Sequence, residues 1–464
     1  MRTALGIGGF VCQLVLSMTA IAASATPLPA PGSEQGVLSL SQAWRLARQH
    51  DPTYHAAISE REAGQSNRAI GRAGLLPQVS ASLGRNRIRG TLETPGACGP
   101  TCTDLNYTSR TNEIRATQAV FNWSRMAEYR QGHARADYSL AVFETKAKDS
   151  SIRLINRYFQ TLLSYENVVL AKGKLQATQK QVKAAQRRLE GGEGTIPDVR
   201  ESQSRRDLSR ADLIKAEDAL IVARRELQEM LGTAPLRLMA LKRDFEPQPL
   251  DPVTEGDWLA MAMTNNAEIR AGAESLRISG QEIDRTFGGH LPTLDLVAAR
   301  RKVHAETIAT RNQSSTTSSI GIQVALPIFA GGLTSAQVEQ ARHNRERSLR
   351  ELAATRARVA VEVTRQYQAV VTGAQRADAL LLAVKSSAEA LKATEMGYQL
   401  GTRSVIDVLD AEEQSYRARL DLTQARLEYA LARLTLAGVV GDLDAAVIDT
   451  VDSTYFGPEK IVLH

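Results

Sequence analysis

Two stretches of this 464-residue chain, 124–190 and 333–400, contain no proline and are rich in residues with high helix propensity. At 1.5 Å per residue, a helix of about 67 residues would be roughly 100 Å long. A globular domain does not need helices of this length, so we expect an element that spans a distance. A Gly-containing break and a shorter predicted helix follow each stretch, over 198–231 and 407–440.

The shorter helices carry apolar side chains at heptad spacing, which predicts coiled-coil-like packing. The leucines seven residues apart are Leu213, Leu220 and Leu227, and then Leu420, Leu427 and Leu434. Two further helices are expected over 41–72 and 257–287. In each half, the first and last helices together are about as long as the central one. Two short helices are therefore expected to stack end to end beside one long helix.

The chain repeats itself with a period of about 210 residues, which indicates a tandem duplication. The matching positions occur in the same order in both halves: Pro77 with Pro292, Phe121 with Phe329, Gly192 with Gly401, Asp198 with Asp407, and Val199 with Val408. The repeats are expected over 26–231 and 257–440. We expect a Pro-rich linker over 232–256 and an irregular tail over 441–464.

Each half also contains two strand-like segments joined by a polar loop. The clearest is SIGIQVALPIF, where apolar residues alternate with small or polar ones from Ser319 to Phe329. Weaker segments cover 77–90, 111–121 and 291–299, and the predicted loops are 91–110 and 304–313. Strands of this length suit a membrane β-barrel. Four strands cannot close a barrel alone, so several chains would have to share one.

The first 25 residues have the pattern of a secretory signal peptide. Arg2 precedes an uncharged apolar run that ends in Ala23-Ser24-Ala25. A membrane anchor is disfavoured because the apolar run is interrupted. No later segment offers the roughly 18 consecutive apolar residues of a membrane helix. Cys98 and Cys102 remain after cleavage, and their spacing around Gly-Pro predicts a local disulfide in an oxidising compartment.

Composition and motifs argue against several function classes. The net charge is +6, with no Lys/Arg patch interleaved with aromatics, so nucleic acid is not an expected partner. No P-loop, H-E-x-x-H or G-x-S-x-G motif is present, and the histidines lack metal-ligand spacing. We therefore expect no enzyme activity, no cofactor and no metal site.

The start of the last long helix carries an unusual set of acidic residues. Ser404 and Asp407 have the spacing of a capping box, which by itself explains the acidic residue at Asp407. Asp410 lies a turn further on, where capping no longer applies, and a solvated charged face is the simpler interpretation of Asp410 and Glu413. Thr195 and Asp198 repeat the capping pattern in the first half.

The motif Y-x-x-G-T-R-x-x-x-D-V-L-D, which begins at Tyr398, and the duplication around it resemble the TolC family of outer-membrane channel-tunnels. The resemblance covers nearly the whole chain after the signal peptide. It implies a mainly α-helical protein with a membrane β-barrel part. Three chains would each give four strands to a 12-stranded barrel in the outer membrane, and their helices would form a periplasmic α-barrel.

The same resemblance implies roles for five residues. Asp407 and Asp410 would form the pore constriction, and Tyr398 and Arg403 would link to Asp198 as an entrance latch. Two unrelated surface charges remain the alternative for Arg403 and Asp198. Pro197 departs from the family pattern because proline has no backbone donor and no polar side chain, so one latch contact would be missing.

Within the family, the chain is most similar to members that serve type I protein secretion. This implies an exit duct for a cyclolysin-like protein toxin, fed by an inner-membrane ABC transporter and a periplasmic adaptor. The alternative is the outer-membrane component of a multidrug or small-molecule efflux pump. A periplasmic coiled-coil scaffold is a further alternative, which the alternating strand over 318–328 disfavours.

Overall fold

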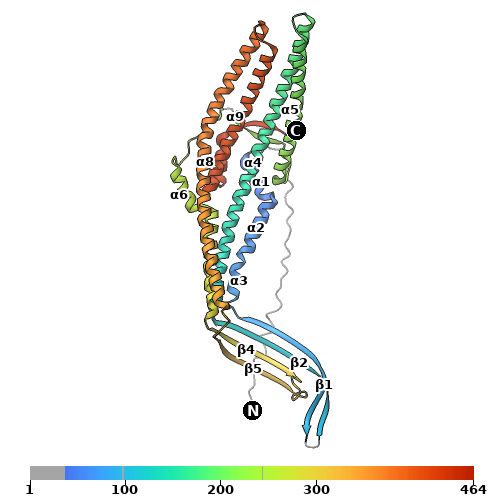
Figure 1. The fold of residues 1–464 in the computed structure, drawn as a ribbon, viewed down its shortest axis with the longest axis vertical. Helices are drawn as coiled ribbons and strands as arrows, with labels where there is room; N and C mark the ends of the chain where they lie inside the picture. The colour runs from blue at the N-terminus through green and yellow to red at the C-terminus, as the bar shows by residue number, and fades with distance from the viewer. Residues whose placement is uncertain (1–36, 97–98, 243, 464) are drawn as a thin grey trace, which may run out of the picture. The chain divides into compact units, whose positions relative to one another are not determined.

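The computed structural model describes residues 37–96, 99–242 and 244–463. The predicted signal peptide therefore lies outside the described residues. Helices and strands follow in the same order in both halves of the chain (Figure 1). Each half contains two long strands, then a very long helix and then a shorter one, as the duplication predicts.

Four helices dominate the structure, and their bounds lie within two residues of those predicted. They are α4 (Trp123–Glu190), α5 (Ile196–Leu231), α8 (Leu333–Gln399) and α9 (Val405–Val440). α4 packs against α5, and α8 packs against α9, so each half ends in a helix hairpin (Figure 1). Leu213 and Leu220 of the heptad series pack against the buried Val168 and Ala171 of α4. This contact confirms the predicted coiled-coil-like packing.

The first helical segment of each half is divided, where we expected one continuous helix. The first half has α1 (Leu40–His50), α2 (Pro52–Gln65) and α3 (Asn67–Ala73), and the second has α6 (Glu255–Asn265) and α7 (Ala267–Phe287). The break at Asp51 has a local cause. Its side chain accepts a hydrogen bond from the Thr53 amide, and Pro52 occupies the first turn, where a missing N–H costs nothing.

Short helices do stack beside the long ones. α2, α3 and α7 lie along the first part of α4, and α5 and α9 lie along the rest of it. α9 and α7 meet end to end, where the Asn266 side chain donates a hydrogen bond to the Val439 carbonyl oxygen at 2.7 Å. This arrangement confirms the predicted stacking.

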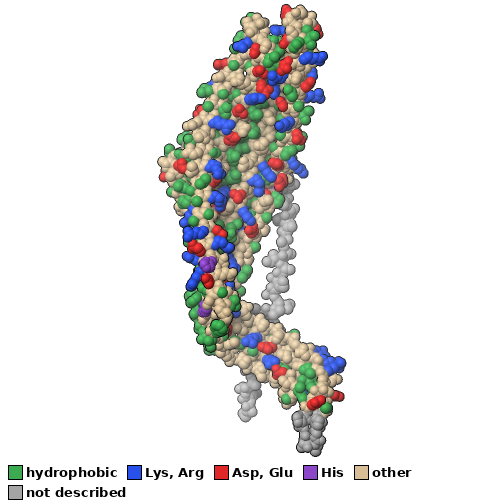
Figure 2. Space-filling view, viewed as in Figure 1, with side chains coloured by type: hydrophobic (Ala, Val, Ile, Leu, Met, Phe, Trp, Pro, Cys, Tyr) green, Lys and Arg blue, Asp and Glu red, His purple; other side chains and the backbone are tan. Residues whose placement is uncertain are grey.

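Charged side chains of both signs are spread along the helices (Figure 2). Among the residues that the structure describes, no helix combines the length and the apolar character needed to cross a membrane.

The four long strands form one antiparallel sheet in the order β1–β2–β4–β5. They are β1 (Gln78–Gly96), β2 (Gly99–Phe121), β4 (Thr293–His304) and β5 (Ser314–Ala325). The β1–β2 ladder continues to the pair Gly96 and Gly99. The predicted loop over 91–110 is therefore wrong. Cross-strand pairing extends both strands through a polar segment whose own sequence gives only a weak strand signal.

The same extension places Cys102 in a strand. It lies in β2 opposite Glu93 and is exposed. Cys98 lies outside the described residues, so the disulfide between the two cysteines stays a prediction.

In the rows closest to the helices, the strand register gives the sheet one apolar and one polar face, whereas Arg300 and Lys302 lie on the apolar side further along β4. Directly opposed residues share a face, and neighbouring rows alternate. One row consists of Val79, Ala116, Ala298 and Ile320, and the next row consists of Ser80, Arg115, Ala299 and Ser319. Val79 and Ile320 are 70% and 77% exposed. The apolar face is therefore open to its surroundings, and the predicted alternation in β5 is confirmed.

The predicted linker contains a short strand, and the tail, predicted to be irregular, forms a helix and a strand, which corrects the prediction for the tail. β3 (Arg237–Leu241) lies within the predicted linker and pairs with β6 (Phe456–Val462), which follows α10 (Ala445–Tyr455) in the predicted irregular tail. Phe456 packs beside Tyr158 of α4 in the main core. Neither strand is identifiable alone, because each depends on a partner more than 200 residues away.

Candidate functional site: the ends of the two helix hairpins

The two hairpins turn through the same backbone structure. Gly192 follows α4 and Gly401 follows α8, with φ angles of +78° and +77°. Side chains other than hydrogen are strained in this left-handed region, so glycine is needed at both turns. In the second turn, the Thr402 amide donates a hydrogen bond back to the Gly397 carbonyl oxygen at 2.9 Å.

Each turn leads into a capping box, as predicted. The Ser404 hydroxyl accepts a hydrogen bond from the Asp407 amide at 3.1 Å, and the Asp407 carboxylate accepts one from the Ser404 amide at 2.8 Å. Thr195 and Asp198 form the same pair of bonds at the start of α5. The backbone and side-chain hydrogen bonds from Ser404 hold the pKa of Asp407 below its usual range. Pro197 fits within the first turn of α5.

Asp410 points toward the neighbouring hairpin. Its carboxylate lies 3.2 Å from the guanidinium of Arg205 on α5, and its side chain is 60% exposed. An exposed pair of this kind contributes only about 0–1 kcal/mol. The pair therefore links α5 to α9 weakly, and a pore-lining role for Asp410 stays a prediction.

Glu413 has a structural role that the sequence did not reveal. Its carboxylate lies 2.7 Å from the Lys174 ammonium of α4 and 2.8 Å from Arg417. Lys174 also contacts Asp212 of α5 at 3.0 Å, so one lysine joins three helices. Burial acts to raise the pKa of Glu413, but the hydrogen bond and charge of Lys174 outweigh it and lower that pKa. No local pattern predicts a partner so far away in the sequence.

Tyr398 is also held by a residue that the sequence did not single out. The Arg188 guanidinium of α4 lies 4.0 Å from the centre of the Tyr398 ring, and it donates a hydrogen bond to the Tyr398 carbonyl oxygen at 3.1 Å. Within the described residues of one chain, no hydrogen bond or ion pair joins Arg403 or Tyr398 to Asp198. The latch among these three residues stays a prediction.

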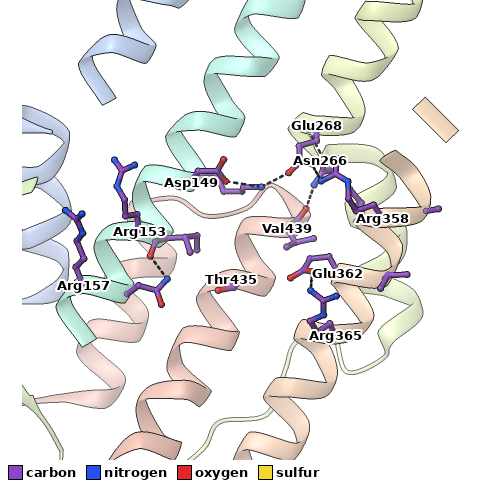
Figure 3. Close-up of a pocket in the computed structure, with 16 residues that line it drawn as sticks. Asp149, Arg153, Arg157, Asn266, Glu268, Arg358, Glu362, Arg365, Thr435 and Val439 are labelled. Atoms are coloured by element: carbon purple, nitrogen blue, oxygen red, sulfur yellow. Dashed lines mark hydrogen bonds and ion pairs between the residues drawn. The ribbon is translucent and has the colours of Figure 1, made fainter. Parts of the chain in front are cut away.

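A separate cavity of about 960 Å³ lies where α9 meets α7, between α4 and α8 (Figure 3). Its cationic side chains already have carboxylate partners. Lys148 and Arg358 share Glu268, and Arg365 pairs with Glu362. The cavity therefore offers little free charge for an ionic ligand, and the ends of the hairpins remain the better candidate for a functional site.

Comparison with known proteins identifies the family. Residues 43–233 and 258–442 match the family described as outer membrane efflux protein. The chain belongs to this family. It is 32% identical to the proteases secretion protein PrtF of Dickeya chrysanthemi, with 89% of this chain and 90% of the relative covered. It is 31% identical to the alkaline protease secretion protein AprF of Pseudomonas aeruginosa, with 91% and 88% covered.

Two further relatives agree with the predicted resemblance to TolC. Outer membrane protein TolC of Escherichia coli is 24% identical, with 88% of this chain and 83% of the relative covered. The CmeC outer membrane channel of Campylobacter jejuni superimposes with a TM-score of 0.76 at 15% identity, and 89% of each chain is covered. The predicted fold class, a helical tunnel with a strand-containing membrane part, is confirmed. Like its relatives, the chain is an outer-membrane transport protein.

Proposed function

We propose that this chain forms the trimeric outer-membrane exit duct of a type I secretion system. The main support for this proposal is the four-stranded sheet, with its unpaired edges and its apolar side. Within the described residues, β1 and β5 are each paired on one side only, and the rows of the sheet closest to the helices expose apolar side chains on one face. Three copies that pair β5 of one chain with β1 of the next would form a closed ring of 12 strands. Closure would remove all open edges and turn the apolar face toward lipid.

The long helices would then form a periplasmic tunnel that ends at the hairpins. Three copies of Asp407 and Asp410 would place six carboxylates around one opening, where they repel one another and favour cations. The weak contacts between the hairpins suit an entrance that a partner must open. An inner-membrane ABC transporter and a periplasmic adaptor would supply that partner, because the chain carries no energy-coupling motif.

The cargo is proposed to be a protein. The sequence comparison with secretion members predicted a cyclolysin-like toxin, whereas PrtF and AprF are both named for protease secretion. A secreted protease is therefore a second candidate cargo. Efflux of small molecules is the alternative function, because the TolC relatives and the family description are compatible with it.

Deletion of the gene tests the proposal. We expect the exported protein to accumulate inside the deletion strain, while susceptibility to antibiotics and detergents stays at the wild-type level. The opposite result, normal protein export with increased susceptibility, would favour efflux. Membrane fractionation gives the control, since recovery in the soluble periplasm would exclude an outer-membrane duct altogether.

A further inference from the structure

Glu412 and Glu413 are neighbours on α9, but their surroundings differ. Glu413 is paired with Lys174 and Arg417. Glu412 points into the packing of the hairpins and is only 7% exposed, and one of its carboxyl oxygens has no hydrogen-bond partner. A buried, ionised carboxylate with an unpaired oxygen is unfavourable, so the neutral acid is the form that this position tolerates.

Groups on three helices face Glu412. Glu395 of α8 is a second carboxylate near it, and Lys180 and Gln181 approach from α4. Tyr416 lies one turn further along α9 and is half-buried. Burial is the main cause that raises the pKa of Glu412 to about 7, and the negative charge of Glu395 adds to it. A hydrogen bond from Gln181 and the charge of Lys180 act in the opposite direction but do not cancel the increase.

We propose that Glu412 is a proton-sensitive switch that controls how tightly α9 packs against α4 and α8. When Glu412 is protonated, the neutral acid stays buried and the hairpins remain together. When Glu412 is ionised, its charge and that of Glu395 repel each other in the junction, which is the packed region between α4, α8 and α9. Separation of the hairpins allows water to hydrate both carboxylates. This inference rests on the proposed function, in which the same end of the tunnel opens and closes.

The direction of the pH effect follows from linkage. An acid whose pKa is higher in the packed state than in water binds its proton more tightly in the packed state. The packed hairpins are therefore favoured below about pH 7 and lose this advantage as the pH rises. If separation returns the pKa of Glu412 from about 7 to its ordinary 4.5, the open-to-packed ratio increases roughly tenfold between about pH 6 and pH 8 in each chain.

Two other carboxylates of this end, Asp407 and Glu413, have lowered pKa values. The hydrogen bonds from Ser404 lower the pKa of Asp407, and Lys174 lowers that of Glu413. Both groups stay ionised from pH 6 to pH 8 and cannot produce a transition near pH 7. A transition in this range would therefore not come from Asp407 or Glu413, and the Glu412→Gln variant tests its assignment to Glu412.

Distance measurements between the hairpins test the proposal on the full-length trimer. After Cys98 and Cys102 are replaced by serine, spin labels are placed at Glu193 and Thr402, which are exposed in the two turns. We expect the ratio of separated to packed hairpins to grow about tenfold from pH 6 to pH 8. Glu412→Gln, which mimics the neutral acid, is expected to abolish this change. Glu395→Gln should move the transition to lower pH, because it removes the like charge.

Glu389→Gln is the matched control, because it removes an exposed carboxylate from α8 without touching the junction. The proposal is wrong if Glu412→Gln keeps the wild-type transition. It is also wrong if EDTA removes the transition, because a divalent cation bound between Glu395 and Glu412 would then be the controlling ligand. The distances do not require channel activity. A pH-dependent distance in a protein that forms no channel would contradict the proposed function and leave this inference intact.

Discussion

The two hairpin ends share a backbone but differ in their side chains. Gly192 and Gly401 make the same left-handed turn, and the same capping box follows each. At other corresponding positions around the turn, the first copy has Leu189, Gly194, Gln203 and Ser204, where the second has Tyr398, Arg403, Glu412 and Glu413. The duplication therefore preserved the turn, while divergence produced the contacts between the copies.

In these contacts, the cationic side chains belong to one hairpin and their partners to the other. The first hairpin supplies the cations Lys174, Arg188 and Arg205, and the second supplies their partners. The hairpins are thus complementary, although they derive from one ancestral unit. Four predictions test this asymmetry, in order of decreasing expected effect.

The largest effect is expected on ion selectivity. Asp407→Asn combined with Asp410→Asn should lower the cation preference several-fold in planar-bilayer recordings, because six carboxylates are lost from one opening of the proposed trimer. The matched control is Asp198→Asn combined with Glu201→Gln, which neutralises the corresponding positions of the first copy. An equal effect of the two double variants would show that both hairpins line the constriction alike.

The ion pair between Lys174 and Glu413 should have the largest effect on stability. A double-mutant cycle of Lys174→Met and Glu413→Gln is expected to show a coupling energy of about 1 kcal/mol, because both side chains are largely buried. Hydrogen exchange of α9 measures this coupling. Because the pKa of Glu413 is lowered in the folded state, the coupling energy should be fully present above pH 4.5. It should disappear as the pH falls through the lowered pKa of Glu413. Coupling that survives strong acid would exclude an ionic origin.

The two capping boxes should contribute equally if the turns are equivalent. Thr195→Ala and Ser404→Ala are each expected to cost about 1 kcal/mol of local stability. Faster amide exchange in the first turn of α5 or α9 would report this loss. A much larger loss of stability for Ser404→Ala would mean that the second turn makes additional stabilising contacts in the closed state.

The smallest effect concerns Tyr398. Tyr398→Leu recreates the residue of the first copy and removes the ring under Arg188, which should cost about 0.5–1 kcal/mol. Tyr398→Phe keeps the ring and should behave like the wild type in hydrogen exchange and in channel conductance. Increased conductance of the Phe variant would instead support a latch through the tyrosine hydroxyl.

Much of the fold was predictable because its causes are local. The ends of the long helices, the glycine turns and both capping boxes depend on residues that are close together in the sequence. The duplication supports each interpretation, because each pattern occurs in both halves. The extended β1–β2 ladder and the β3–β6 pair were not predictable. Their stability comes from partners far away in the sequence, and polar segments such as 91–110 have only a weak strand signal of their own.

The sequence by itself determined where the four longest helices begin and end, where their hairpins turn and where acidic residues gather. Only the tertiary structure decided which acidic residues are paired. Glu412 and Glu413 are adjacent and chemically identical, yet a rotation of about 100° around the helix axis buries one and gives the other a lysine. That difference arises from the helices packed around α9, because burial and partner charges depend on neighbours that the local sequence does not contain.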